Sequence, residues 1–203
     1  APSFGNFYKM KELAFVRQGG ADGYYPQISG LWGLTTDTMC EPIKEELDID
    51  MNDVNVVLTT EIHPYMVIQR KNAPWGPPMA GLIKYIKANP GKIKYMARDV
   101  GSGHDIACEW IMREFGVRDN VTIKIPLGSH QEVASAIGAG MGDFACTQAD
   151  VAMTNWQAGK VDVSMVLGRS VPPPWDKDPN VVYSVQAGLP DAPIGTILGF
   201  TVH

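Results

Sequence analysis

Apolar residues follow two different periods along most of this chain. Short runs of branched and aromatic residues, typical of strands, alternate with stretches in which apolar side chains recur every three or four residues, typical of helices. The clearest unit predicts a strand over 92–97, a loop over 98–103 and a helix from about His104 to Phe115. That helix is expected because one apolar stripe runs along it, formed by Ile106, Ala107, Trp110, Ile111 and Phe115.

A second unit repeats this order of strand, loop and helix within residues 121–138. Both helices are expected to begin after a serine. Ser102 is followed by Asp105, and Ser129 by Glu132, at the three-residue spacing of a capping box. The same alternation continues with a strand over 143–146, a helix over 149–158 and a strand over 161–167.

Strands that alternate with helices predict an α/β fold, with parallel-rich sheets flanked by helices on both faces. Two further β-rich runs, over 54–61 and 65–69, are separated by His63-Pro64. We expect these runs to cross between two lobes, and the strand over 161–167 to be the return. The prediction is two α/β lobes with a cleft between them: residues 1–68 with 164–203 form lobe 1, and residues 69–163 form lobe 2.

Composition narrows the classes of function. The chain has 203 residues, of which 45% are hydrophobic and 19% charged, which is ordinary for a globular domain. The net charge of −5 and the absence of a Lys/Arg run argue against nucleic-acid binding. No apolar run approaches the roughly 20 residues that span a membrane. No signal peptide is visible at the start, so we expect either a cytosolic chain or a mature or trimmed form of an exported one.

No cofactor or metal site is expected. The loop Gly101-Ser102-Gly103 begins like a dinucleotide fingerprint, but the third glycine of that motif is replaced by Ile106. The four histidines lack metal-ligand spacing. The three cysteines form no C-x-x-C motif. We interpret them as buried thiols rather than as a catalytic cysteine or a disulfide, although an oxidising compartment would allow one pair to close; they are Cys40, Cys108 and Cys146.

Both serine-initiated helices should start at the carboxyl edge of a sheet, where ligands of α/β folds bind. A helix N-terminus presents free N–H groups and the positive end of the helix dipole, so it favours an anion. Arg98, at the end of a strand, could clamp a carboxylate; it could instead be a solvated loop arginine, or one paired with Asp99. Trp32 could line the cleft or pack between lobes. Ser102 and Ser129 are better explained as caps than as nucleophiles served by His104 or His130.

Five segments occur in an order that points to a known family: Asp22-Gly23-Tyr24, 82–95 (LIKYIKANPGKIKY), 121–128 (VTIKIPLG), Ala158-Gly159-Lys160 and 186–190 (QAGLP). Together they resemble the periplasmic solute receptors of tripartite tricarboxylate transporters, of the Bordetella uptake gene type, from about Met10 to Phe200. The resemblance implies a two-lobed type II periplasmic binding protein that is not an enzyme. Such a receptor closes on a small carboxylate, a di- or tricarboxylate or an aromatic acid, and delivers it to a membrane permease.

In that family, backbone N–H groups and waters from two β–α loops, one per lobe, hold the carboxylates of the ligand. The resemblance places the first-lobe segment at 29–32, the second-lobe loop at 98–104, a further loop at 127–128 and a strand end at 147–148. The ligand-binding residues that we predict are Ser29, Trp32, Arg98, Gly101, Ser102, Gly103, His104, Gly128, Ser129, Thr147 and Gln148.

The sequence also departs from the family pattern. The glycine-rich first loop with its strand, and the helices that usually follow Val202, are absent, so we expect either a fragment or a lineage that has lost one carboxylate loop. The second loop contains Arg98, and a charged clamp is expected to replace part of the water-bridged contact. Two alternatives stay open: the ligand-sensing domain of a transcription regulator, for which no DNA-reading domain is visible, and a small hydrolase.

Overall fold

The computed structural model describes residues 27–30, 55–98, 100, 102–191 and 195–202. Its contacts divide the chain into two compact units, one of residues 1–63 with 196–203 and the other of residues 64–195. The boundaries of these units differ from those of the predicted lobes, and the lobe assignment stays a prediction. In the first unit, β1 (Gln27–Gly30) pairs antiparallel with β8 (Gly195–Val202).

The second unit contains a mixed sheet in which most pairings are parallel. β3 (Ile93–Ala97) lies between β4 (Val121–Pro126) and β5 (Phe144–Gln148) and is parallel to both. β6 (Val161–Leu167) pairs in parallel with the short β7 (Val182–Tyr183). The exception is β2, which runs antiparallel to β5 on one side and to β6 on the other.

Strand β2 corrects one prediction. The sequence predicts two strands separated by His63-Pro64, whereas the structure has one strand of 16 residues, Asn55–Arg70. The fixed φ of proline is compatible with an extended chain, and its missing N–H matters only where the ladder needs a donor. The pairing of β2 with β5 and β6 begins at Tyr65, directly after the proline.

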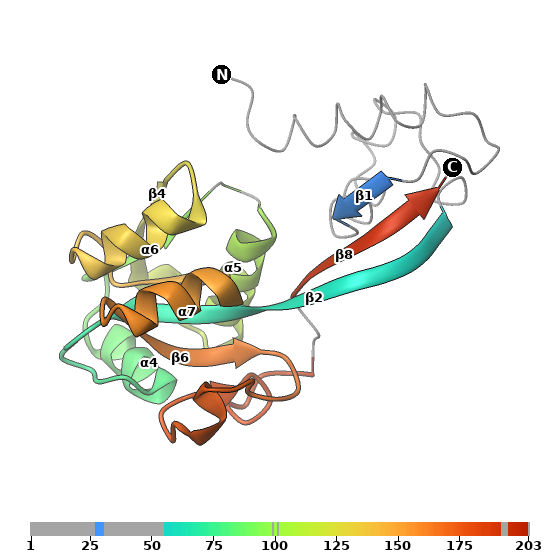
Figure 1. The fold of residues 1–203 in the computed structure, drawn as a ribbon. Coiled ribbons are helices and arrows are strands. Elements are labelled where there is room, and N and C mark those ends of the chain that lie inside the picture. Colours follow the sequence, from blue (N-terminus) through green and yellow to red (C-terminus); the bar gives the residue numbers. More distant parts are fainter. Residues whose placement is uncertain (1–26, 31–54, 99, 101, 192–194, 203) are drawn as a thin grey trace. The chain divides into compact units, whose positions relative to one another are not determined.

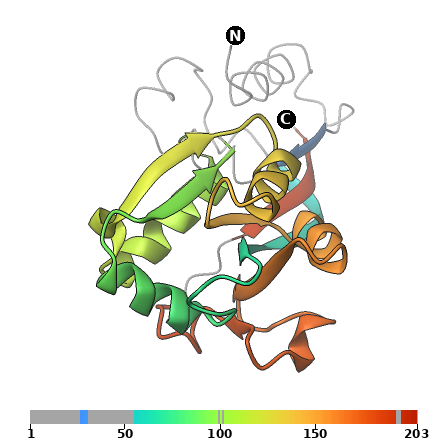
Figure 2. The same ribbon diagram turned by 90° about the vertical axis from the view of Figure 1, so that its left-hand side faces the viewer.

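Helices cover both faces of this sheet (Figure 1; Figure 2). α4 (Met79–Ala88) and α5 (Gly103–Glu114) pack on one face, and α6 (His130–Gly138) and α7 (Ala149–Gln157) on the other. Two single-turn 3-10 helices, Arg118–Asn120 and Trp175–Lys177, complete the regular structure that is described.

The alternation of side chains along β2 separates two hydrophobic cores. Tyr65 and Val67 pack with the residues of α4 and α5, whereas Met66 and Ile68 pack with those of α6 and α7. All four side chains are at most 1% exposed. The sheet is therefore buried on both faces, as expected for a parallel-rich sheet.

Candidate functional site

Three helices begin at one edge of the sheet in the second unit. β3, β4 and β5 are parallel neighbours, and each is followed directly along the chain by a helix: α5, α6 and α7 respectively. Because the carboxyl ends of parallel strands meet at one edge, the N-termini of these helices meet there too. The loop after β4 is tied to the end of β3, since the Leu127 N–H donates to the Ala97 carbonyl at 2.9 Å.

Serine caps open the first two of these helices, as predicted. Ser102 Oγ accepts a hydrogen bond from the Asp105 N–H at 3.4 Å, and Ser129 Oγ accepts one from the Glu132 N–H at 3.2 Å. A cap of this kind satisfies one of the four N–H groups that a helix start leaves outside the helical ladder. Gln148 is the residue before α7, and its side chain makes no cap.

Three aromatic rings meet where α5 and α6 begin. The ring centroids of His104 and His130 are 3.9 Å apart, and those of Tyr65 and His104 are also 3.9 Å apart. All three side chains are buried, with Tyr65 at 1%, His104 at 6% and His130 at 8% exposed. The starts of the two serine-capped helices are therefore adjacent. Tyr65 of β2 completes the cluster, because its ring contacts His104.

The electrostatics of this cluster are those of a positive, poorly solvated site. Burial, together with the neighbouring His130 and Arg98, lowers the pKa of His104 to about 2. His104 is therefore neutral at physiological pH, and a neutral imidazole donates through one ring nitrogen and accepts through the other. Within the described part of the chain, His104 Nε2 has no hydrogen-bond partner. Burial is the main cause of this shift, but the positive charge of Arg98, which also contributes to it, favours an anion beside the ring.

Arg98 contributes a positive charge to this cluster. It follows the last residue of β3 directly and is partly buried. Its effect on His104 places its charge near the start of α5, where a guanidinium can form a bidentate pair with a carboxylate. The structure thus brings together the predicted residues Arg98, Ser102, Gly103 and His104.

The end of β5 contributes two more predicted residues on opposite faces of the sheet. Gln148 lies directly opposite Tyr65 in the antiparallel ladder, so these two side chains share a face. Thr147 lies opposite Met66, on the other face. Thr147 is fully buried, and no partner for its Oγ1 is found among the described residues. Gln148 therefore lies on the α4–α5 side of the sheet, with Tyr65, and Thr147 lies on the α6–α7 side.

The loop before α6 carries a feature that opposes anion binding. A side-chain carbon added at Gly128 would lie 3.1 Å from Glu132 Oε2, so the carboxylate of Glu132 folds back over this loop. A negative charge there offsets part of the positive end of the α6 dipole. The α5 end of the cluster, next to Arg98, is therefore the more favourable place for an anion.

The remaining predicted residues lie elsewhere. Ser29 is in β1, opposite Gly199 of β8, in the other unit. Trp32 and Gly101 lie outside the described residues. Sequence reasoning missed two members of the cluster, Tyr65 and His130. His130 had a visible signal, since it directly follows the capping Ser129, whereas Tyr65 is brought in only by the pairing of β2 with β5.

The cysteines that are described are buried free thiols, as interpreted from the sequence. Cys108 lies on α5 and Cys146 on β5. Burial raises the pKa of the Cys108 thiol well above its usual value, and the adjacent Cys146 raises it further. A thiol whose pKa is raised in this way is a poor nucleophile. Cys40 lies outside the described residues.

Neither a metal site nor a membrane-spanning helix is found in the described ranges. In these ranges, no group of three or more His, Cys, Asp or Glu side chains is arranged to hold a metal ion. No helix in the same ranges has the length and apolar character needed to cross a bilayer.

Solved structures of known proteins resemble this fold. The periplasmic binding protein BugD aligns with a TM-score of 0.74 at 17% identity, over 96% of this chain and 61% of that one. MatC from Rhodopseudomonas palustris with bound malate aligns with a TM-score of 0.72 at 18% identity, over 98% and 64%. A TctC solute binding protein from Polaromonas gives 0.74 at 21% identity, over 95% and 62%. No protein-family model and no curated protein matched the sequence.

BugD is a periplasmic binding protein and the Polaromonas protein is a TctC solute binding protein, and the chain has the fold of these neighbours. The predicted α/β class and the resemblance given from the sequence are confirmed at this level. The chain spans slightly less than two thirds of the length of these neighbours.

Proposed function

We propose that this chain is an extracytoplasmic solute receptor that binds a small carboxylate and is not an enzyme. The second unit contributes the N-terminus of α5, the side chain of Arg98 and the neutral imidazole of His104. The predicted first-lobe contribution of Ser29 and Trp32 and the predicted interlobe cleft are part of this proposal. So are a periplasmic location and delivery of the ligand to the permease of a tripartite transporter.

The observation that carries the proposal is the contact of His104 with His130 at the adjacent helix starts, beside Arg98. Two helix N-termini and one guanidinium concentrate positive potential on a buried site that has an unused ring nitrogen. A carboxylate matches this arrangement in charge, and its two oxygens can accept from the guanidinium and the helix N–H groups together. MatC, one of the structural neighbours, carries malate.

The hydrolase alternative receives less support. The hydroxyl oxygens of Ser102 and Ser129 accept from backbone N–H groups, which is the role of a cap. A nucleophilic serine needs its hydroxyl to donate to a base. His104, two residues after Ser102, has an Nε2 without a partner in the described structure.

Isothermal titration calorimetry of the 203-residue chain tests the proposal. Malate, adipate and benzoate are titrated, each beside its neutral amide. We expect at least one carboxylate to bind and its amide not to bind, because only the anion gains from the positive potential. Failure of every carboxylate, or equal binding of acid and amide, contradicts the proposal.

Two arginine variants sharpen this test. Arg98→Gln should weaken the carboxylate by about 10- to 100-fold, since a hydrogen bond to a charged group contributes roughly 1.5–3 kcal/mol. Arg113→Gln is the matched control, because Arg113 is an exposed residue in the last turn of α5, at the opposite end of that helix. Equal affinities of the two variants would remove Arg98 from the site.

A further inference from the structure

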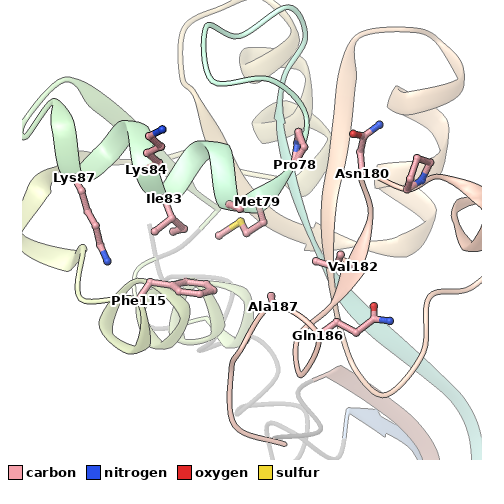
Figure 3. A pocket seen from close by; sticks show the side chains of 12 residues that line it. Pro78, Met79, Ile83, Lys84, Lys87, Phe115, Asn180, Val182, Gln186 and Ala187 are labelled. Carbon is pink, nitrogen blue, oxygen red and sulfur yellow. The ribbon is translucent and has the colours of Figure 1, made fainter.

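A cavity of about 510 Å³ lies on the α4–α5 side of the second unit, among residues that the candidate site does not use (Figure 3). Its walls come from α4, from Phe115 just after α5, and from the segment 179–187, which contains β7. Small-molecule sites in proteins have volumes of about 300–1,000 Å³, so this space can hold a compact organic ligand.

The cavity is well separated from the cluster at the helix starts. Phe115 follows the last residue of α5, whereas His104 lies in its first turn. Eleven residues separate them, and at 1.5 Å of rise per residue this places the two positions about 16 Å apart along the helix. A ligand in the cavity would therefore occupy a second site, and the inference goes beyond the proposed function.

The walls of the cavity are mainly apolar. Met79 and Ile83 of α4 and the ring of Phe115 point into the space, and Val182 and Ala187 line its other side (Figure 3). No aspartate or glutamate is among the lining residues. Removal of apolar surface from water is favourable, so these walls stabilise a ligand whose apolar part covers them.

Two lysines stand at the border of this apolar space. Lys84 and Lys87 line the cavity and are exposed. Lys87 extends from the end of α4 on the Phe115 side, whereas the ammonium of Lys84 points away from that side (Figure 3). Neither ammonium has an acidic partner among the described residues. Lys87 in the last turn suits the α4 dipole. The helix dipole does not explain why an apolar cavity lies beside Lys87. The cavity and the lysine together offer an apolar surface with a positive charge at its border.

We propose that this cavity binds an amphipathic monocarboxylate, such as a medium-chain fatty acid. The alkyl chain packs against Met79, Ile83 and Phe115, and the carboxylate lies at the mouth beside the ammonium group of Lys87. A dicarboxylate does not fit this arrangement, because its second charge would have to enter the apolar walls without a partner.

Calorimetry with octanoate and octan-1-ol tests the proposal on the complete 203-residue chain, with methyl NMR of Met79 as a local readout. Octanoate should bind and shift the Met79 methyl signal, also when adipate is present in excess. The double variant Lys84→Met/Lys87→Met should weaken octanoate at least tenfold and leave octanol unchanged. Lys160→Met is the matched control, since Lys160 is exposed but does not line the cavity, and it should bind octanoate like the wild type.

A second variant fills the cavity without removing charge. Ala187→Phe places a ring in the space from a partly buried position, and should abolish octanoate binding while the response to dicarboxylates stays as in the wild type. The proposal is overturned if the wild type does not bind octanoate, or if the double lysine variant binds it as tightly as the Lys160 control. Displacement of octanoate by adipate, or its loss in Arg98→Gln, would place it at the helix starts and also overturn the proposal.

Discussion

The hydroxyl of Tyr95 donates a 2.8 Å hydrogen bond to Asp105 Oδ1, which joins the middle of β3 to the first turn of α5. Both side chains are 2% exposed. Burial raises the pKa of the Tyr95 phenol well above its usual range, and the neighbouring Cys108, Cys146 and Asp105 add to this shift. The phenol therefore stays protonated and remains a donor. The bond holds the helix start that carries His104 against the sheet.

Tyr95→Phe should destabilise the protein because it takes a donor from a buried carboxylate. The expected loss in the free energy of unfolding is about 1–3 kcal/mol, measured by urea denaturation. Tyr85→Phe is the control, since the ring of Tyr85 packs against Trp75 and no hydrogen bond of its hydroxyl is found in the described part of the chain. Equal stability of the two variants would show that the Tyr95–Asp105 bond contributes nothing measurable.

His104 should make stability depend on pH. Its folded-state pKa of about 2 lies below the value of 6.5 that an unperturbed histidine has. Between these values the unfolded chain binds a proton that the folded chain does not bind. The free energy of unfolding therefore decreases as pH falls. His104 alone lowers the free energy of unfolding by up to about 1.4 kcal/mol for each pH unit below 6.5, and it has no such effect above that pH.

We therefore expect His104→Gln to flatten the decline of Tm between pH 6.5 and pH 4, measured by thermal denaturation at a series of pH values. His63→Gln should keep the wild-type slope, because the partly buried His63 lies outside the ring cluster at the helix starts. A His104 variant with an unchanged slope would contradict the assignment of a buried, neutral imidazole.

Local features of the fold were predictable from the sequence, and long-range features were not. The caps at Ser102 and Ser129 are confirmed, because a serine hydroxyl and the N–H three residues on are fixed by the first helical turn alone. The glycine that ends α7, Gly159, has the positive φ of 69° that a helix C-terminus favours. These features depend on neighbours in sequence.

The candidate site contains contacts between residues far apart in sequence, which were not predicted. Tyr65 enters the cluster because β2 pairs with β5 and brings its ring onto His104, and no local pattern signals that contact. The continuity of β2 through Pro64 was missed for a similar reason, since proline is read as a break unless the pairing partners are known. Sequence patterns therefore predicted which loops meet at the sheet edge, but not the rings that fill the space between them.

Removal of the Ser129 cap should have a modest and local effect. Ser129→Ala leaves the Glu132 N–H without its side-chain acceptor and is expected to cost about 1 kcal/mol in the free energy of unfolding. Ser129→Asp should restore this stability because aspartate caps equally well. Ser170→Ala, at an exposed bend, is the control and should lie within about 0.5 kcal/mol of the wild type. A result in which Ser129→Ala matches this control would argue against the cap.

At Gly81, helix propensity and packing predict opposite effects of an alanine substitution on the free energy of unfolding. It lies inside α4, where exchange of glycine for alanine normally stabilises a helix by roughly 0.5–1 kcal/mol. A Cβ added there would lie 2.1 Å from the carbonyl oxygen of Trp75. That backbone is held in place, because Trp75 Nε1 donates to the fully buried Gln69 Oε1 at 2.9 Å and the Gly76 N–H donates to the Ala73 carbonyl.

The clash should therefore outweigh the propensity, since the oxygen cannot move without disturbing the turn over 73–76. We expect Gly81→Ala to lower the free energy of unfolding by at least about 1–3 kcal/mol, in the range of overpacked sites. Ala80→Gly, at the exposed neighbouring position, measures the propensity term by itself and should cost about 1 kcal/mol. If Gly81→Ala stabilises the chain, α4 does not lie against the Trp75 carbonyl as closely as the structure places it.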